Sequence, residues 1–170
     1  MKEKLITFAV PCYNSQDYMA KAIESALQGG DDVEILVVDD GSKDDTLSIA
    51  QQYESKYPHI VRAIHKENGG HGSAVNTGIA NATGLYFKVL DSDDWFDKTA
   101  MLKLIKFLRQ SVVESMSLDM IIANYVYEKP SAHKRKAINY NIAIPKNKII
   151  TWSDVKPVSY THLTLPTILL

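Results

Sequence analysis

Three carboxylates fall within four positions of the sequence, at Asp91, Asp93 and Asp94, directly after an apolar run that ends at Leu90. Carboxylates this close repel one another, so keeping all of them ionised requires a cation or a dense set of donors nearby. Mg²⁺ is a hard cation that proteins usually hold with one or two carboxylates, together with water and substrate phosphates. We therefore expect Asp91 and Asp93 to hold a divalent metal whose other ligands are diphosphate oxygens.

A simpler role is open to the neighbouring carboxylates. Asp94 or Asp97 could cap the helix expected after Trp95, and the remaining ones could be solvated turn residues. We favour this structural role for Asp94, but not for Asp91 and Asp93.

The elements that must position these residues are short apolar runs that alternate with segments of helical periodicity. Such alternation predicts βαβ units and an α/β fold with a mostly parallel sheet flanked by helices. Asn14 or Ser15, and then Asp44 or Asp45, are expected to cap the first two helices. The expected strands cover residues 5–10 (stopped by Pro11), 33–38, 60–64 and 85–90, and the buried stripe of the last helix is expected to contain Met101, Leu104, Ile105, Leu108 and Val112.

Polar segments follow each of the four expected strands, at residues 11–14, 39–42, 68–72 and 91–94. Parallel sheets with right-handed crossovers bind their ligands outside the carboxyl ends of the strands. Each segment alone could be an ordinary turn. Because all four follow strands, we expect them to meet at one edge of the sheet and form a binding site there.

Composition restricts the class of protein. A chain of 170 residues with 45% hydrophobic and 23% charged residues fits one globular domain with a sizeable core. The formal net charge of −1 gives no global field that would recruit nucleic acid, so no nucleic-acid partner is expected. The single cysteine, Cys12, excludes an internal disulfide and is expected to be a buried strand-end residue, not a nucleophile. Residues 1–4 run directly into an expected strand and no apolar run reaches the length of a membrane span, so we expect neither a secretion signal nor a span in this sequence.

The region after residue 117 has a different pattern. Residues 118–127 and 138–144 are candidate strands, and residues 129–136 form a polar, basic connection between them. The basic run at 133–136 is expected to be a solvated loop, with contact to an anionic acceptor or a membrane surface as the less favoured alternative.

The last residues are set apart from the fold. Residues 158–167 resemble the translation of a transposon-derived sequencing adapter. We therefore expect a single domain within residues 1–157 and a non-native tail at 158–170.

The motifs at the four strand ends resemble those of the nucleotide-sugar-binding half of family-two glycosyltransferases, which have the GT-A fold. The likeness covers roughly residues 4–128. The matching pieces agree in order and spacing: Val10-Pro11-Cys12-Tyr13-Asn14, Val37-Val38-Asp39-Asp40-Gly41-Ser42, Glu67-Asn68-Gly69-Gly70 with Asn76-Thr77-Gly78, and Leu90-Asp91-Ser92-Asp93-Asp94-Trp95.

This resemblance implies a role for each matching position. Tyr13 would offer an aromatic face to the base, and Asp40 would accept a hydrogen bond from uracil N3–H. Asp93 would be the direct ligand of Mn²⁺ or Mg²⁺, with Asp91 contacting the ribose or the metal shell. The substrate-binding residues implied are Pro11, Tyr13, Asn14, Asp40, Asn68, Gly70, Asp91 and Ser92, and the metal ligands implied are Asp93 and Asp91.

The resemblance also implies an activity and partners. The donor would be a nucleotide-sugar, with UDP favoured and dTDP or GDP left open, and the acceptor a glycan or a lipid-linked glycan. An inverting transfer needs a general base, yet Glu128 and Asp154 are the only carboxylates after Asp119 and neither fits. We therefore expect a truncated chain that retains donor binding, in a cytoplasmic protein whose missing part could attach it peripherally to the membrane.

Other classes of nucleotide-binding protein explain the motifs less well. A nucleotidyltransferase would need a glycine-rich, basic phosphate loop where residues 11–15 have neither, and a dehydrogenase would need G-x-G-x-x-G there. A receiver domain would need an aspartate at the end of the third strand, where the chain has His65-Lys66-Glu67. A nucleotide-binding module without transfer activity stays open, and binding of UDP, ATP or NAD would separate these classes.

Overall fold

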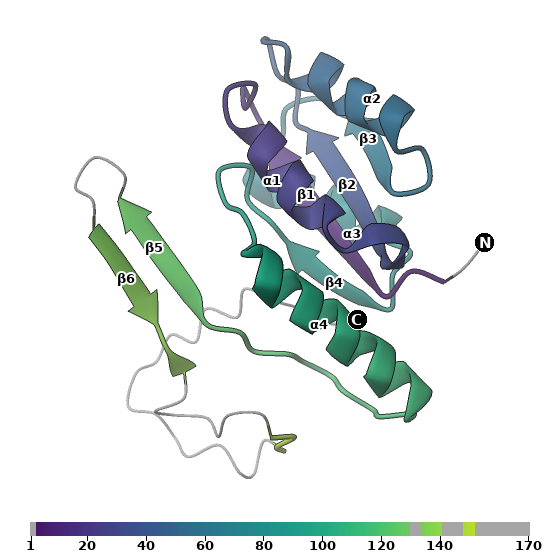
Figure 1. Ribbon diagram of the computed structural model, residues 1–170. Helices are drawn as coiled ribbons and strands as arrows, with labels where there is room; N and C mark the ends of the chain where they lie inside the picture. The colour runs from purple at the N-terminus through teal and green to yellow at the C-terminus, as the bar shows by residue number, and fades with distance from the viewer. Residues whose placement is uncertain (1–2, 130–133, 141–147, 152–170) are drawn as a thin grey trace. The chain divides into compact units, whose positions relative to one another are not determined.

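The computed structural model describes residues 3–129, 134–140 and 148–151. The described residues fall into two compact units that divide after Asp119, and each unit is considered by itself. The first unit contains a sheet with helices on both faces (Figure 1). Residues 158–170, the expected tail, lie outside the described residues.

The sheet of the first unit is wholly parallel, as the sequence predicts. Its strands are β1 (Ile6–Cys12), β2 (Val33–Asp39), β3 (Val61–His65) and β4 (Tyr86–Val89), in the order β3-β2-β1-β4. All seven residues of β1 and of β2 are buried, which explains why these strands are almost wholly apolar. The order reverses between β1 and β4, and a reversal of this kind is where open α/β sheets bind ligands.

Strand β1 continues through Pro11 to Cys12, so the prediction that Pro11 stops the strand is wrong. The pairing of β1 with β4 ends at Ala9, whereas its pairing with β2 continues to Cys12. Proline lacks only its own N–H donor. At Pro11, β1 is therefore still paired with β2 on one side, whereas on the other side β4 has already ended.

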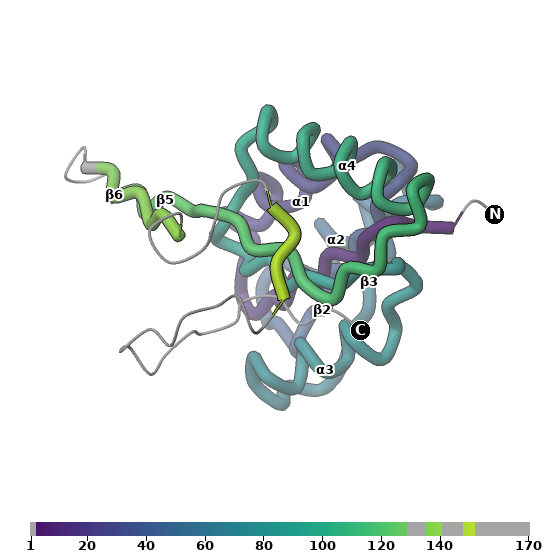
Figure 2. Tube along the Cα trace, turned by 90° about the horizontal axis from the view of Figure 1, so that it is seen from below, coloured from purple at the N-terminus to yellow at the C-terminus, as the bar shows by residue number. Residues whose placement is uncertain are grey.

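Helices α1 (Met19–Leu27), α2 (Thr46–Lys56), α3 (His71–Asn81) and α4 (Lys98–Val113) connect or follow the strands, with a short 3₁₀ turn at Gly30–Asp32. Figure 2 shows α3 on the opposite side of the sheet from α1 and α4. Leu36 and Val38 of β2 pack with Ala74 of α3. Gly78 allows α3 to approach β1 closely, because a Cβ at this position would lie 2.6 Å from the Cβ of Ala9.

The helix starts differ in part from the sequence prediction. The prediction that Asn14 or Ser15 caps the first helix is wrong, since α1 begins at Met19 after Tyr18 and has no side-chain cap. The Ser15 hydroxyl instead accepts from the Tyr13 amide. Asp44 accepts from the Thr46 amide at the start of α2. Of the two predicted caps of α4, Asp94 and Asp97, it is Asp97 that accepts from Ala100 N, at 2.9 Å.

The predicted buried stripe of α4 is correct for three of its five residues, whereas Leu104 is only half-buried and the end of the stripe is wrong. Met101, Ile105 and Leu108 are buried, but Val112 is 47% exposed and Ser111 is buried in its place. The Ser111 hydroxyl donates to the carbonyl of Leu108, which satisfies it inside the core.

In the second unit, β5 (Tyr125–Lys129) and β6 (Lys134–Ile138) form an antiparallel pair. The predicted strand at 118–127 is therefore wrong for residues 118–124, and β6 lies where the sequence predicts a connection. Five of the ten residues in these two strands are charged, which favours a solvated hairpin, whereas the prediction relied on apolar runs. Most of the predicted strand at 138–144 lies outside the described residues. Within the described ranges, no helix is long and apolar enough to cross a bilayer.

Candidate active site

Hydrogen bonds join the polar segments that follow β1, β2 and β4. The Asn14 amide donates to Ser42 Oγ at 2.9 Å, and the Lys43 amide donates to Asn14 Oδ1 at 2.9 Å. The hydroxyls of Ser15 and Ser92 lie 3.1 Å apart. The expected meeting of these segments at the carboxyl edge of the sheet is therefore present.

The first segment presents one free aromatic ring at this edge. Pro11 is buried, whereas the side chain of Tyr13 is 48% exposed. Asn14 adopts φ +50°, a left-handed conformation that asparagine tolerates better than most residues. Asn14 thus fixes the turn to the loop after β2, and Tyr13 keeps a ring face available to a planar group.

Asp40 is buried beneath the loop that follows β3. Its Oδ1 accepts from the Lys66 ammonium and from the Gly69 amide at 3.0 Å, and its Oδ2 accepts from the Gly70 amide at 2.7 Å. Burial alone would raise the pKa of Asp40, but the bonds from Lys66 and from the two amides outweigh it and hold the pKa below the usual value. The carboxylate is therefore ionised and anchors residues 66–70.

Two glycines make this anchoring possible. Gly41 has φ +73°, and a Cβ at this position would lie 2.8 Å from the backbone nitrogen of Asn68. Gly70 has φ +85°, which side chains other than glycine rarely adopt. The Asn68 side chain donates to the Asp40 carbonyl at 2.9 Å, so the loops after β2 and β3 are joined by backbone and side chain together.

The preceding carboxylate, Asp39, has a different role. It is fully buried, accepts from the Ser42 amide at 3.2 Å and lies 2.7 Å from Nδ1 of His65. These bonds stabilise the turn after β2. Asp39 is therefore a structural residue of the edge.

The carboxylates after β4 lie in solvent at the same edge. The Asp91 side chain is 51% exposed, and its Oδ1 lies 3.7 Å from Nε2 of His71 at the start of α3. Asp94 donates its amide to the Asp91 carbonyl at 2.9 Å, which closes a turn. Partial desolvation, followed by the charges of Asp93 and Asp91, raises the pKa of Asp94.

A cation at this turn would take part of its ligands from elsewhere. Among the described residues, no group of three or more histidine, cysteine, aspartate or glutamate side chains is arranged to hold a metal ion. Such a donor set fits a hard cation that keeps water and substrate phosphates in its shell, and it does not fit an all-protein cage. The chemistry of Asp91 and Asp93 therefore suits a metal that binds together with a diphosphate.

Cys12 is buried at the end of β1, as predicted. Burial, together with the charge of Asp39, raises the pKa of its thiol to about 12. Because the thiolate is the reactive form, we expect the folded protein to resist iodoacetamide at pH 8, with labelling measured by mass spectrometry. Unfolding in guanidinium should restore labelling, and rapid labelling of the folded chain would contradict this assignment.

The sequence analysis gave no role in the site to three residues of the edge. Lys66 holds Asp40, His71 faces Asp91, and Ser15 bonds both Tyr13 and Ser92. Lys66 and His71 lie beside the glycines that follow β3. A basic residue next to such glycines is the one sequence feature that could have predicted their place in the site.

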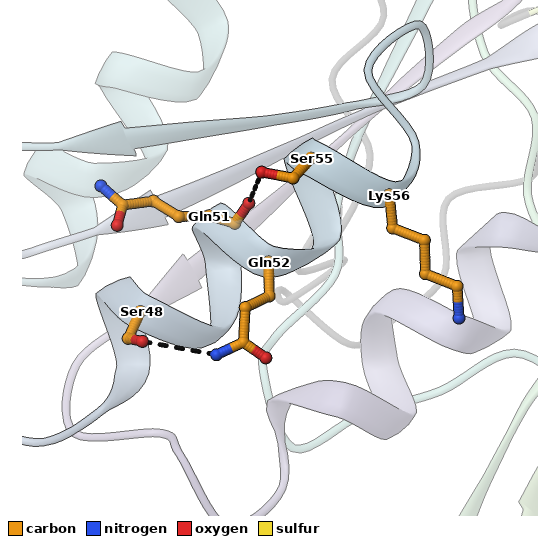
Figure 3. A pocket seen from close by; sticks show the side chains of 5 residues that line it. All are labelled: Ser48, Gln51, Gln52, Ser55 and Lys56. Carbon is orange, nitrogen blue, oxygen red and sulfur yellow. Dashed lines mark hydrogen bonds between the residues drawn. The ribbon is translucent and has the colours of Figure 1, made fainter.

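A shallow pocket elsewhere on the first unit has no relation to this edge. Figure 3 shows that its lining comes from one face of α2: Ser48, Gln51, Gln52, Ser55 and Lys56. Within this lining, Gln52 Nε2 donates to Ser48 Oγ at 3.4 Å, and Ser55 Oγ donates to the Gln51 carbonyl at 2.9 Å. None of them belongs to the segments that follow the strands.

Comparison with solved structures supports the fold. S. aureus TarS (residues 1–349), solved in complex with UDP-GlcNAc, is similar to this chain with a TM-score of 0.54 and 29% sequence identity. The likeness covers 64% of this chain and 32% of TarS. The parallel sheet and its flanking helices thus match a GT-A enzyme.

Sequence comparison identifies relatives of the same kind. An uncharacterized glycosyltransferase of Rickettsia prowazekii is 48% identical over 91 residues, which is 53% of this chain and 27% of that protein. Chondroitin synthase of Escherichia coli is 42% identical over 98 residues, or 57% of this chain and 14% of the synthase. The chain thus spans less than a third of the length of each of these relatives. The sequence model described as Glycosyl transferase family 2 matches residues 7–156, and the chain belongs to this family.

Proposed function

We propose that the protein transfers a sugar from a nucleotide-sugar donor, with a UDP-sugar favoured, to a glycan or lipid-linked acceptor. The observation that carries this proposal is the meeting of Tyr13, the Asp40-anchored loop and the carboxylates after β4 at one edge of the sheet. The structure of TarS was solved in complex with UDP-GlcNAc, which supports the choice of donor. Chondroitin synthase and a teichoic acid biosynthesis protein of Bacillus subtilis among the relatives support a polysaccharide product.

In this proposal, different residues of the edge contact different parts of the donor. The Tyr13 ring stacks on the base, with Pro11 and Asn14 shaping its turn. Asp40 keeps an oxygen lone pair for uracil N3–H while it holds Asn68 and Gly70 against the nucleotide. Ser92 and Asp91 lie where the ribose would extend toward the carboxylate turn.

Asp93 and Asp91 would hold Mn²⁺ or Mg²⁺, which neutralises charge on a departing diphosphate. Inversion at the sugar carbon would need a base that deprotonates the acceptor, and no carboxylate of the described residues is assigned to that task. We further propose that residues 1–157 form the domain, with 158–170 outside it, and that contact with a membrane would come from parts of a longer protein.

The test is a panel of nucleotides titrated into the protein by calorimetry. We expect UDP to bind in the presence of Mn²⁺, to weaken strongly with a chelator, and to exceed ATP and NAD in affinity. Tyr13→Ala should weaken UDP binding by roughly tenfold, through loss of about 1.5 kcal/mol of stacking. Tyr18→Ala is the matched control, because Tyr18 is a similarly exposed tyrosine on the α1 side. Preferential binding of ATP or NAD would contradict the proposal.

A further inference from the structure

The β5–β6 hairpin has two chemically different faces. Its register pairs Tyr125 with Ile138 and Tyr127 with Lys136, and these pairs alternate with Val126–Ala137 and Glu128–Arg135. Residues directly opposite each other in an antiparallel pair share one face, and successive pairs change face. Tyr125, Tyr127, Lys136 and Ile138 therefore lie together on what we call the tyrosine face.

The tyrosine face is an exposed array of aromatic rings. The rings of Tyr125 and Tyr127 meet edge to face, with centroids 5.2 Å apart and planes at 79°. Tyr140 extends the array, since its ring centroid lies 6.3 Å from that of Tyr125. Tyr125 is 41% exposed and Tyr127 is 56% exposed, so both rings are available to a ligand.

Charge is distributed unevenly between the two faces. On the opposite face, Arg135 Nη2 lies 2.6 Å from Oε1 of Glu128, so that cation is already neutralised. On the tyrosine face, the register places Lys136 opposite Tyr127, so no carboxylate faces it within the hairpin's described pairs. The tyrosine face thus combines exposed aromatic rings with the ammonium group of Lys136, in a chain of net charge −1.

We propose that the tyrosine face binds an anionic glycan. This inference rests on the proposed function, because it assigns the chemical class of the acceptor. Sugar rings present apolar C–H faces that suit exposed tyrosine rings, while carboxylate or phosphodiester groups along the chain suit lysine ammonium groups. Tyrosine hydroxyls add donors and acceptors for the sugar hydroxyls.

Two other anionic partners fit the face less well. A membrane-binding surface uses tryptophan, phenylalanine and leucine to enter the acyl boundary, whereas Ile138 is the one large aliphatic residue of this face. Single-stranded nucleic acid stacks successive bases on aromatic platforms, but the rings of Tyr125 and Tyr127 are nearly perpendicular.

The experiment is a titration of the whole chain with a hyaluronan decasaccharide and, separately, with its carboxyl-reduced, neutral form. Binding is measured by calorimetry at low salt. We expect the anionic form to bind, the neutral form to bind much more weakly, and added salt to reduce the difference. Tyr127→Ser should weaken binding roughly fivefold, whereas Tyr127→Phe, which keeps the ring, should retain most of it.

Matched variants separate a specific face from general charge. Lys136→Gln should weaken binding roughly threefold to fivefold. Arg135→Gln removes the same charge from the opposite face, and Val126→Ser changes a comparably exposed residue there, so both should bind as the unaltered chain does. Equal losses for Lys136→Gln and Arg135→Gln would overturn the proposal.

Titrations with other anionic ligands test whether the partner is a glycan. Tighter binding to oligo(dT) or to phosphatidylglycerol vesicles than to the decasaccharide, or no binding to the decasaccharide at all, would also overturn the proposal. UDP binding is measured on the same variants and should not change. A chain that binds the glycan but not UDP would contradict the proposed function and leave the tyrosine face intact as a glycan site, so the two failures are distinguishable.

Discussion

Replacing Asp93 with asparagine is expected to abolish most of the metal-dependent affinity for UDP. The substitution removes the negative charge and one ligand oxygen from a site whose described residues offer few other ligands. A metal bridging to phosphate contributes several kcal/mol, so a loss of about 3 kcal/mol, or a factor of roughly 100 in Kd, is expected. The loss of affinity is measured by calorimetric titration of UDP into the protein in the presence of Mn²⁺.

Asp97→Asn is the matched control for this variant. It makes the same change of charge four residues away, at the residue whose side chain caps α4. We expect it to lower the free energy of unfolding by about 1 kcal/mol or less and to leave UDP binding unchanged. If Asp93→Asn bound UDP with Mn²⁺ as tightly as the unaltered chain does, the assignment of Asp93 to the metal would fail.

Replacing Asp40 with alanine is expected to have the largest effect on stability at the site. The variant removes the acceptor of three donors, and the amides of Gly69 and Gly70 lose their partner. Breaking a buried ion pair costs about 3–5 kcal/mol, and we expect the lower end because Lys66 can return its ammonium to water. Thermal or chemical unfolding measures the loss, and UDP affinity should fall with it because residues 66–70 lose their anchor.

The pH dependence of this loss has a definite sign. The folded pKa of Asp40 is depressed, so its contribution to stability is complete above the unfolded value of about 3.9 and disappears as the pH falls through the folded pKa. The difference in stability between the unaltered chain and Asp40→Ala should therefore be constant near neutrality and shrink below about pH 4. Asp45→Ala is the control, since Asp45 is exposed and makes no capping bond. An Asp40→Ala variant of unchanged stability would contradict the role given to this carboxylate.

The local pattern of the sequence was enough to predict the sheet. Runs such as residues 33–38 are apolar throughout because both faces of β2 are covered, and the polar segments after them mark the edge where ligands bind. The same pattern placed Tyr13 and Asp91 at that edge. These features depend on neighbouring residues, so they can be recognised without knowledge of the tertiary structure.

Features that depend on distant partners were not predictable in this way. The Asp40 carboxylate is held by residues 26 to 30 positions away, so its burial beneath Lys66 and Gly70 could not be inferred from the spacing of the motif. Pro11 lies inside β1 because β4 ends before it, which is a property of the neighbouring strand. Val112 followed the helical period, but the core ends one residue earlier at Ser111.

The strand order described above also determines how the site assembles during folding. Thr7 on β1 donates to Glu34 on β2, 27 residues away, whereas it accepts from the amide of Gly84, just before β4, across 77 residues. Closing the longer loop costs roughly 1 kcal/mol more in chain entropy, and contacts of such separation slow folding. We therefore expect the β1–β2 side of the edge to form between more local neighbours. The carboxylates after β4 are expected to take their places only when the pairing of β1 with β4 is complete.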